Sequence, residues 1–262
     1  MNKPQVSLVI PIRNEEASIE RLIDSIARQT LAPDEIVLVD GGSTDRTVEI
    51  VERIAAGDAR FRLIRTDGAT PGKGRNIGIE AASFEVIALT DAGIMLEDDW
   101  LEILVASLAP SATSPGFEGG NGPDADIVYG NVDPVIDNLF EKCAAIAFVA
   151  EKKAKVIRME FIASCLFKKQ VWRKVGGFPD LRAAEDLMFM EAVEAAGFRA
   201  SIAPDAMVHW QLQPDVLSTL QKFILYSKHN VWAGRQWDWH YGIVRLYVAL
   251  VPFVVLAAVH SR

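Results

Sequence analysis

Asp91 is the residue whose position in the sequence most clearly suggests chemistry. It follows an uninterrupted apolar run, Val86-Ile-Ala-Leu89, and precedes the small residues Ala92 and Gly93. Such a run is typical of a strand that is buried on both faces of a parallel sheet. Because ligands bind at the carboxyl ends of strands in open α/β sheets, the carboxylate is a candidate for binding a cation or a sugar hydroxyl. Capping of the next turn is the alternative role.

Polar side chains follow two other predicted strands. Arg13, Asn14 and Glu15 come after a strand expected over Val6–Ile12, and Asp40 ends a strand expected over 35–40. Since the carboxyl ends of parallel strands meet at one edge of a sheet, we expect these side chains to lie near the central carboxylate.

The stretch Gly72-Lys-Gly-Arg-Asn-Ile-Gly78 adds two cations to this edge. It has neither the spacing of a Walker loop nor that of the dinucleotide-binding pattern. Lys73 and Arg75 can pair with phosphate as a point charge and a planar fork, although two solvated cations in a turn are the alternative. Combined with Asp40, which can accept from a nucleobase N–H, and with Asp91 near ribose or metal, they predict a nucleotide-diphosphate pocket.

The order of the elements indicates how these residues are positioned. Apolar runs at 6–12, 35–40, 61–65 and 86–90 alternate with helical patterns, which predicts an α/β fold with a right-handed, largely parallel, Rossmann-like sheet and helices on both faces. Ser43 or Thr44 is expected to cap the second helix, and Glu97-Asp98-Asp99 to open a helix through about Leu108. Further along we expect a loop over 110–123 and strands over 126–130, 161–167, 198–203 and 206–210. Helices are expected over 138–155, from the end of the 161–167 strand to 175, and from 185 to 196.

The composition limits the class of protein. The chain has 262 residues, half of them hydrophobic, and a formal net charge of −8, which argues against a general nucleic-acid binder. Cys143 and Cys165 match no metal spacing and are expected to be reduced core residues, as in a cytosolic protein. The apolar run near the N-terminus is too short for a signal peptide and favours a strand.

Several segments occur in an order that resembles a known family. They are Val6-Ser-Leu-Val-Ile-Pro-Ile-Arg-Asn-Glu15, Val39-Asp-Gly-Gly-Ser-Thr-Asp45, Gly72-Lys-Gly-Arg-Asn-Ile-Gly78, Thr90-Asp-Ala-Gly93, and Gly176-Gly-Phe with Ala184-Glu-Asp186. Together they resemble the family 2 glycosyltransferases, which have the GT-A fold, and the resemblance extends from about Val6 to Trp210.

The resemblance implies inverting transfer of a sugar from a nucleotide diphosphate to an acceptor hydroxyl. Asp186 matches the catalytic base, with Glu185 in support, because the attacking oxygen must lose its proton. Acids that stabilise a helix N-terminus are the alternative role for this pair. The resemblance places the nucleotide-sugar site at Pro11, Arg13, Glu15, Asp40, Gly42, Gly72, Lys73, Arg75, Asp91 and Ala92, the first four at the nucleobase end.

The implied metal site is incomplete in this sequence. Asp91 matches the first acid of the family's Asp-x-Asp element, but Gly93 replaces the second. Asp91 and His209 would be the protein ligands of a divalent ion, Mn²⁺ or Mg²⁺, which prefers several oxygen ligands. His209 also has the alternative role of a core histidine. In a metal-independent enzyme, Lys73, Arg75 or Arg182 would neutralise the diphosphate instead.

The sequence divides into a GT-A domain over 1–212 and a C-terminal helical segment over 213–262. Leu217, Leu220, Ile224 and Val231 form an apolar stripe at helical spacing, and a run without charged residues extends from 246 to 259. Trp and Tyr near a basic segment and an apolar run are typical of a membrane interface. The run is shorter than the roughly 18–20 residues that span a bilayer. It therefore predicts a monotopic anchor or a hairpin arm, unless the chain continues; a buried terminal helix is the alternative.

These features predict an inverting, non-processive glycosyltransferase, hexosyltransferase-like, at the cytoplasmic face of the inner membrane. It would be peripheral or anchored by its C-terminal segment. A UDP-sugar is the favoured donor, and a glycan or lipid-linked acceptor is expected from cell-envelope or polysaccharide synthesis. The Gln-x-x-Arg-Trp element of processive synthases is absent, which favours single-sugar transfer. The alternatives are a non-catalytic nucleotide-sugar-binding module and a nucleotidyltransferase.

Overall fold

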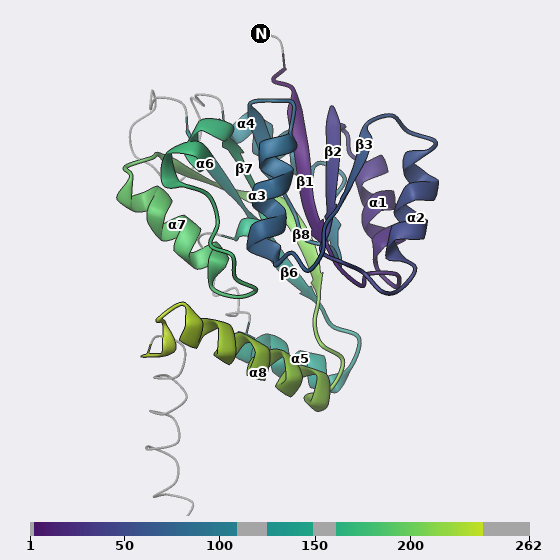
Figure 1. Ribbon diagram of the computed structural model, residues 1–262, viewed down its shortest axis with the longest axis vertical. Coiled ribbons are helices and arrows are strands. Elements are labelled where there is room, and N and C mark those ends of the chain that lie inside the picture. The colour runs from purple at the N-terminus through teal and green to yellow at the C-terminus, as the bar shows by residue number, and fades with distance from the viewer. Residues whose placement is uncertain (1–2, 109–124, 149–160, 238–262) are drawn as a thin grey trace, which may run out of the picture.

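A computed structural model describes residues 3–108, 125–148 and 161–237 of the chain (Figure 1). The loop predicted over 110–123, the end of the helix predicted to reach 155, and the apolar run over 246–259 lie outside these residues. No helix in the described part is both long enough and apolar enough to cross a bilayer.

The strands of the N-terminal half are parallel, as the sequence predicts. They are β1 (Val6–Ile12), β2 (Glu35–Asp40), β3 (Phe61–Arg65) and β4 (Val86–Leu89), and they lie in the order β3-β2-β1-β4. Ile12 lies beside Asp40 in the register between β1 and β2, and Val9 lies beside Leu89 of β4. The ends of these strands, and the polar loops after them, therefore share one edge of the sheet.

The rest of the sheet is mixed rather than parallel. In the described residues the sheet continues from β4 through β7 (Cys165–Lys168), β6 (Ile127–Val135) and β8 (Ala200–Gln211) to β5 (Ile94–Leu96). Strand β7 is antiparallel to both its neighbours, β6 and β8 are parallel, and β5 is antiparallel to β8.

Two predictions for this half need correction, and one strand was not predicted. The strand predicted over 161–167 begins as a 3₁₀ turn, Ile162–Ser164. The two strands predicted over 198–210 form one long strand with an irregularity in its pairing to β6. Strand β5 was not predicted, because its three residues are too short for a periodicity to show.

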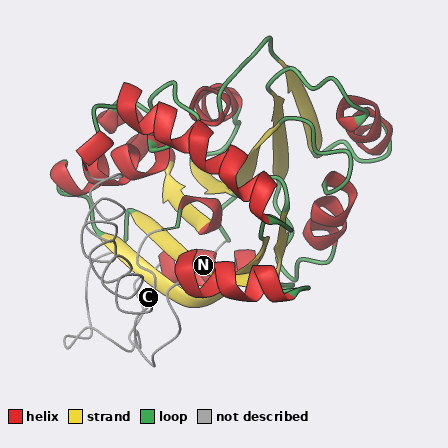
Figure 2. Cartoon of the chain, turned by 90° about the horizontal axis from the view of Figure 1, so that it is seen from below, coloured by secondary structure: helices red, strands yellow, loops and turns green. Residues whose placement is uncertain are grey.

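Helices cover both faces of the sheet (Figure 2). Residues that alternate along β1 point to opposite faces: Leu8 and Ile10 pack with one hydrophobic cluster, and Val9 packs with the other. This two-sided burial explains the continuous apolar runs of the parallel strands. Helices α1 (Ile19–Ala27), α2 (Thr47–Ala55) and α4 (Trp100–Leu108) pack on the first face, and α3 (Pro71–Ala81), α6 (Lys169–Val175) and α7 (Glu185–Ala195) on the second.

Two further helices, α5 (Leu139–Phe148) and α8 (Val216–Trp232), lie at the end of the sheet where β6 and β8 leave it (Figure 1). Asp215 caps α8, because its carboxylate accepts from the Ser218 N–H at 2.8 Å. The division of the chain at 212 stays a prediction, and β8 ends at Gln211, one residue before it.

The glycine-rich stretch lies inside helix α3 rather than in a turn before it. Thr70 caps the helix and Pro71 is its first residue. The glycines permit close packing: a Cβ at Gly78 would lie 2.4 Å from Val9 Cγ1, and one at Gly72 would lie 2.0 Å from the Pro179 carbonyl oxygen. These two glycines therefore set how closely α3 approaches β1 and the 176–182 loop.

The cysteines differ in environment. Cys165 is buried in the core, as predicted, but Cys143 on α5 is exposed, so its prediction as a core residue was wrong. Both are free thiols.

Candidate active site

The loops after β1 and β2 are joined by hydrogen bonds. The Asn14 N–H donates to Ser43 Oγ at 2.9 Å, and the Thr44 N–H donates to Asn14 Oδ1 at 2.8 Å. Ser43 in turn donates its hydroxyl to Asp40 Oδ1 at 2.5 Å. Ser43 and Thr44 therefore hold the loops after β1 and β2 together and do not cap α2, which begins at Thr47 without a side-chain cap.

The buried carboxylate of Asp40 organises its own turn. It is 3% exposed and also accepts from the Gly42 N–H at 3.1 Å. Arg13 is exposed in the adjoining loop, and Pro11 lies against α3, where a Cβ at Gly74 would be 3.2 Å from its own Cβ. The structure thus brings the predicted nucleobase-end residues to the same edge.

Arg75 is the centre of the site. Its two terminal nitrogens reach carboxylates from different parts of the chain: Nη2 donates to Asp91 Oδ1 at 2.6 Å, and Nη1 donates to Glu185 Oε1 at 2.8 Å. The guanidinium also lies 5.5 Å from the centre of the Phe178 ring. Arg75 therefore joins α3 to the end of β4 and the start of α7.

Most of this bridge is buried. The side chains of Arg75 and Glu185 are 4% and 7% exposed, whereas that of Asp91 is 37% exposed. Although burial by itself would lower it, the pKa of Arg75 is raised by Asp91 and Glu185, so the guanidinium stays charged. Burial raises the pKa of Glu185 against the opposing effect of Arg75. Both terminal nitrogens of Arg75 are thus paired with carboxylates, and its contact with a phosphate stays a prediction.

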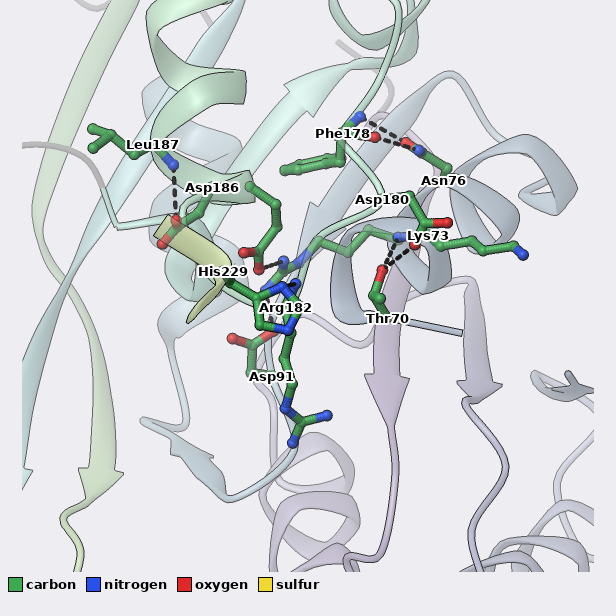
Figure 3. Close-up of polar contacts among 12 residues, drawn as sticks. Thr70, Lys73, Asn76, Asp91, Phe178, Asp180, Arg182, Asp186, Leu187 and His229 are labelled. Carbon is green, nitrogen blue, oxygen red and sulfur yellow. Dashed lines mark hydrogen bonds and ion pairs between the residues drawn. The ribbon is translucent and has the colours of Figure 1, made fainter. Parts of the chain in front are cut away.

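Asp186 stands next to this bridge without taking part in it. It is half-buried in the first turn of α7, and its Oδ1 accepts from the Leu187 N–H at 2.8 Å (Figure 3). The residue that precedes the pair, Ala184, has a left-handed backbone with φ of 68°. This conformation is rare for residues with a Cβ, and such residues cluster at functional sites.

Asn76 is a site-building residue whose role the sequence did not indicate. Its amide nitrogen donates to the Phe178 carbonyl at 2.7 Å, and its Oδ1 accepts from the Phe178 N–H at 2.8 Å and from Trp172 Nε1 at 2.9 Å. A Cβ at Gly177 would lie 2.6 Å from the same oxygen. Asn76 therefore fixes the Gly-Gly-Phe turn, and with it the ring that packs on Arg75.

Helix α8 adds residues that were not predicted for the site. The Arg182 N–H donates to Nδ1 of the buried His229 at 3.1 Å, so this nitrogen must be unprotonated. Burial lowers the pKa of His229, and Arg182 and Lys228 act in the same direction. Burial also raises the pKa of Tyr226 to about 12, with Glu185 and Asp91 contributing. Through His229, α8 therefore packs against the loop that carries Arg182.

Asp91 and His209 do not come together as the metal ligands that the sequence predicts. His209 Nε2 lies 2.5 Å from Glu97 Oε1, so the imidazole is paired with that carboxylate and not with Asp91. Gly93 has φ of 78°, and a Cβ there would lie 3.8 Å from Glu15 Oε2. No group of three or more His, Cys, Asp or Glu side chains suited to a metal occurs among the residues that the structure describes.

The fold and the arrangement of carboxylates at the sheet edge define a glycosyltransferase of the GT-A type. The profile described as "Glycosyl transferase family 2" matches residues 7–142, more than half of the chain. The chain therefore belongs to glycosyltransferase family 2. Among curated proteins, EpsH of Bacillus subtilis (strain 168), named as a glycosyltransferase, is 39% identical over 102 residues, which cover 39% of this chain and 28% of EpsH. The chain thus matches less than a third of the length of that relative.

Solved structures support the fold. PcManGT, a mannosyltransferase from Pyrobaculum calidifontis in complex with GDP-Man and Mn²⁺, has a TM-score of 0.63 at 23% identity and covers 90% of this chain and 65% of its own. Residues 1–349 of TarS from S. aureus, in complex with UDP-GlcNAc, have a TM-score of 0.61 at 21% identity. The match covers 81% of this chain and 60% of the TarS chain. At these identities the likeness concerns the fold.

A double-mutant cycle tests the Arg75–Glu185 bridge. We expect Arg75→Met to lower the free energy of unfolding by about 3–5 kcal/mol, because it leaves a buried carboxylate without its cation. The double variant Arg75→Met/Glu185→Met should cost far less than the sum of the two single changes. Urea denaturation followed by circular dichroism measures the cycle, and strictly additive losses would contradict the bridge.

The bond to His229 predicts a pH dependence of stability. Because the folded state lowers the pKa of His229 below its ordinary 6.5, its contribution is present above that pH and is lost as the pH falls through the lowered value. His229→Asn can keep an acceptor without titrating. We expect the wild type to lose about 1 kcal/mol relative to this variant on acidification from pH 7 to 5. Parallel pH dependences in the two proteins would show that His229 does not titrate against folding.

Proposed function

We propose that this chain catalyses inverting transfer of a single sugar from a nucleotide-diphosphate sugar to an acceptor hydroxyl. The observation that carries the proposal is the Arg75 bridge, which joins Asp91 at the end of β4 to Glu185 at the start of α7. It positions the neighbouring Asp186, a half-buried carboxylate that is not one of the two partners of the bridge, beside the sheet edge where donors bind in α/β folds.

The chemistry assigns a separate task to each acid. Asp186 is the base: it takes the proton of the acceptor hydroxyl as that oxygen attacks the anomeric carbon. The bond between this carbon and the diphosphate oxygen breaks on the opposite face, and its electron pair leaves with the diphosphate, which inverts the configuration. Glu185, held by Arg75, orients the first turn of α7 and does not contact the sugar.

For the donor we propose a UDP-sugar. The support is the nucleobase end built by Arg13, Glu15 and Asp40, and the fact that TarS, which shares the fold, binds UDP-GlcNAc. PcManGT binds GDP-Man, so a guanine nucleotide is the competing donor. A binding module without catalysis is the second candidate function, favoured by Gly93 in place of an acid.

Asp186→Asn separates the two candidate functions. For an enzyme, we expect UDP binding to persist within about threefold, and the rate of donor turnover to fall by a factor of about 10²–10⁴, the usual contribution of a general base. Binding is measured by calorimetry and turnover by release of UDP. Glu194→Gln, an exposed change on the same helix, is the control. Turnover that survives Asp186→Asn would show that Asp186 is not the base. Absence of turnover in the wild type would favour the binding module.

We also propose that α8 contacts the cytoplasmic face of the inner membrane, so that the protein is peripheral or anchored by its C-terminal segment. The support is a set of exposed apolar side chains on this helix: Leu217 is 67% exposed, Leu220 53% and Ile224 70%. Leu139 at the start of the neighbouring α5 is 77% exposed. Apolar side chains grouped on a surface mark protein or membrane contacts, and an interfacial helix buries such a face in lipid. An acceptor bound to lipid would then lie close to the site.

Vesicle sedimentation tests this contact. The triple variant Leu217→Ser/Leu220→Ser/Ile224→Ser should reduce the partition coefficient on vesicles of zwitterionic and anionic lipid by about tenfold or more, since each apolar side chain adds ~1 kcal/mol when it leaves water. Gln221→Ser, an exposed polar position on the same helix, should leave partitioning unchanged. Equal partitioning of the triple variant and the wild type would exclude α8 as the contacting surface.

A further inference from the structure

Helix α8 has an inward face that differs in chemistry from its exposed apolar side. Lys222, Tyr226 and the buried His229 recur at spacings of four and three residues and so lie on one side of the helix. The Lys222 ammonium lies 4.9 Å from the centre of the Trp210 ring and 5.5 Å from that of Tyr226. Two aromatic rings thus hold this cation in place, Trp210 from the end of β8 and Tyr226 from α8 itself.

Two carboxylates of the site act on the charge of Lys222 without forming an ion pair with it in the described residues. Asp91 and Glu15 attract the positive charge of Lys222 and so raise its pKa, whereas Arg182 repels that charge and lowers the pKa. Burial lowers the pKa of Lys222, which is half-buried. In the part of the chain that the structure describes, no carboxylate oxygen lies within 4 Å of its ammonium. An ammonium held in this way keeps its capacity to donate to a ligand.

Arg182 is the second cation at this place. Its backbone is fixed by His229 of α8, and Figure 3 shows its guanidinium extending past Asp91. Its charge also acts on Glu15, Lys222 and Tyr226.

The other cations near the site are used differently. Arg75 is bound to two carboxylates. Lys73 is exposed on α3, and in Figure 3 its side chain extends away from the carboxylates. Figure 3 shows Arg182 beside Asp91, and Trp210, whose ring lies next to the Lys222 ammonium, is the strand partner of Ile94. Ile94 follows Gly93, the residue that stands where the family has a second acid.

We propose that Lys222 and Arg182 form a cationic subsite for the diphosphate of the donor, an inference that rests on the proposed function. As the bond between the anomeric carbon and the diphosphate oxygen breaks, negative charge grows on that oxygen. The ammonium and the guanidinium stabilise this charge by charge-assisted hydrogen bonds. Binding and departure of the diphosphate then depend on α8.

Calorimetry with UDP, UMP and uridine, each with EDTA and with Mn²⁺, tests the subsite. In EDTA, we expect Lys222→Met to weaken UDP binding by about tenfold to a hundredfold, the usual value of a hydrogen bond to a charged group, and to leave uridine binding unchanged. Arg182→Met should behave in the same way, and Lys222→Arg should restore most of the affinity. Lys228→Met, an exposed change on the same helix, should have no effect.

The outcomes separate this proposal from the wider one. Equal UDP affinity in Lys222→Met and Lys228→Met would overturn the subsite while leaving the glycosyltransferase intact. UDP binding by the wild type that disappears in EDTA would also overturn it, because a metal would then neutralise the diphosphate. A wild type that binds neither UDP nor GDP under any condition would refute the proposed function itself. Thermal unfolding of each variant shows that a loss of binding is not a loss of fold.

Discussion

The buried guanidinium of Arg75 is the constraint on which the site depends. Removing a charge of this size from water costs several kcal/mol, and only well-placed opposite charges offset that cost. The two carboxylates that do so come from the end of β4 and the start of α7, which are almost a hundred residues apart in sequence. The fold can bury Arg75 only if these two ends meet. The same requirement places Asp186, and it is supported by Asn76, which fixes the turn that carries Phe178.

The bridge also determines the electrostatics around it. Arg75 brings one positive charge to Asp91 and Glu185, and Glu15 lies nearby with a pKa that burial raises. This group of Arg75, Asp91, Glu185 and Glu15 thus holds more acids than cations, although the donor that we propose carries a diphosphate. In the subsite that we propose, the cations that balance it come from the 176–182 loop and from α8. This explains why the polar face of α8 lies toward the site.

The sequence was sufficient for the parts of the fold that local pattern determines. The apolar runs of β1, β2, β3 and β4 are buried on both faces, so their parallel arrangement and the gathering of Asp40 and Asp91 at one edge could be predicted. Glu185 could be paired with Asp186 through a motif, but its bond to Arg75 joins residues 110 positions apart, and no local pattern reports such a contact. The inward face of α8 was missed for the same reason, and strand β5 because it is only three residues long. The stripe of Leu217, Leu220 and Ile224 dominates the periodicity of α8, yet the face that packs against the site is the polar one.

The two faces of α8 also determine how far the site lies from the membrane surface that we propose. An α-helix with its side chains is about 10–12 Å across. If the apolar face rests on lipid as proposed, the Lys222 side lies about one helix diameter above that surface. An acceptor hydroxyl that meets the donor there must project by a similar height from the bilayer. The helix would then act as a spacer that selects acceptors by their height, favouring a short lipid-linked saccharide over the distant end of a long polymer.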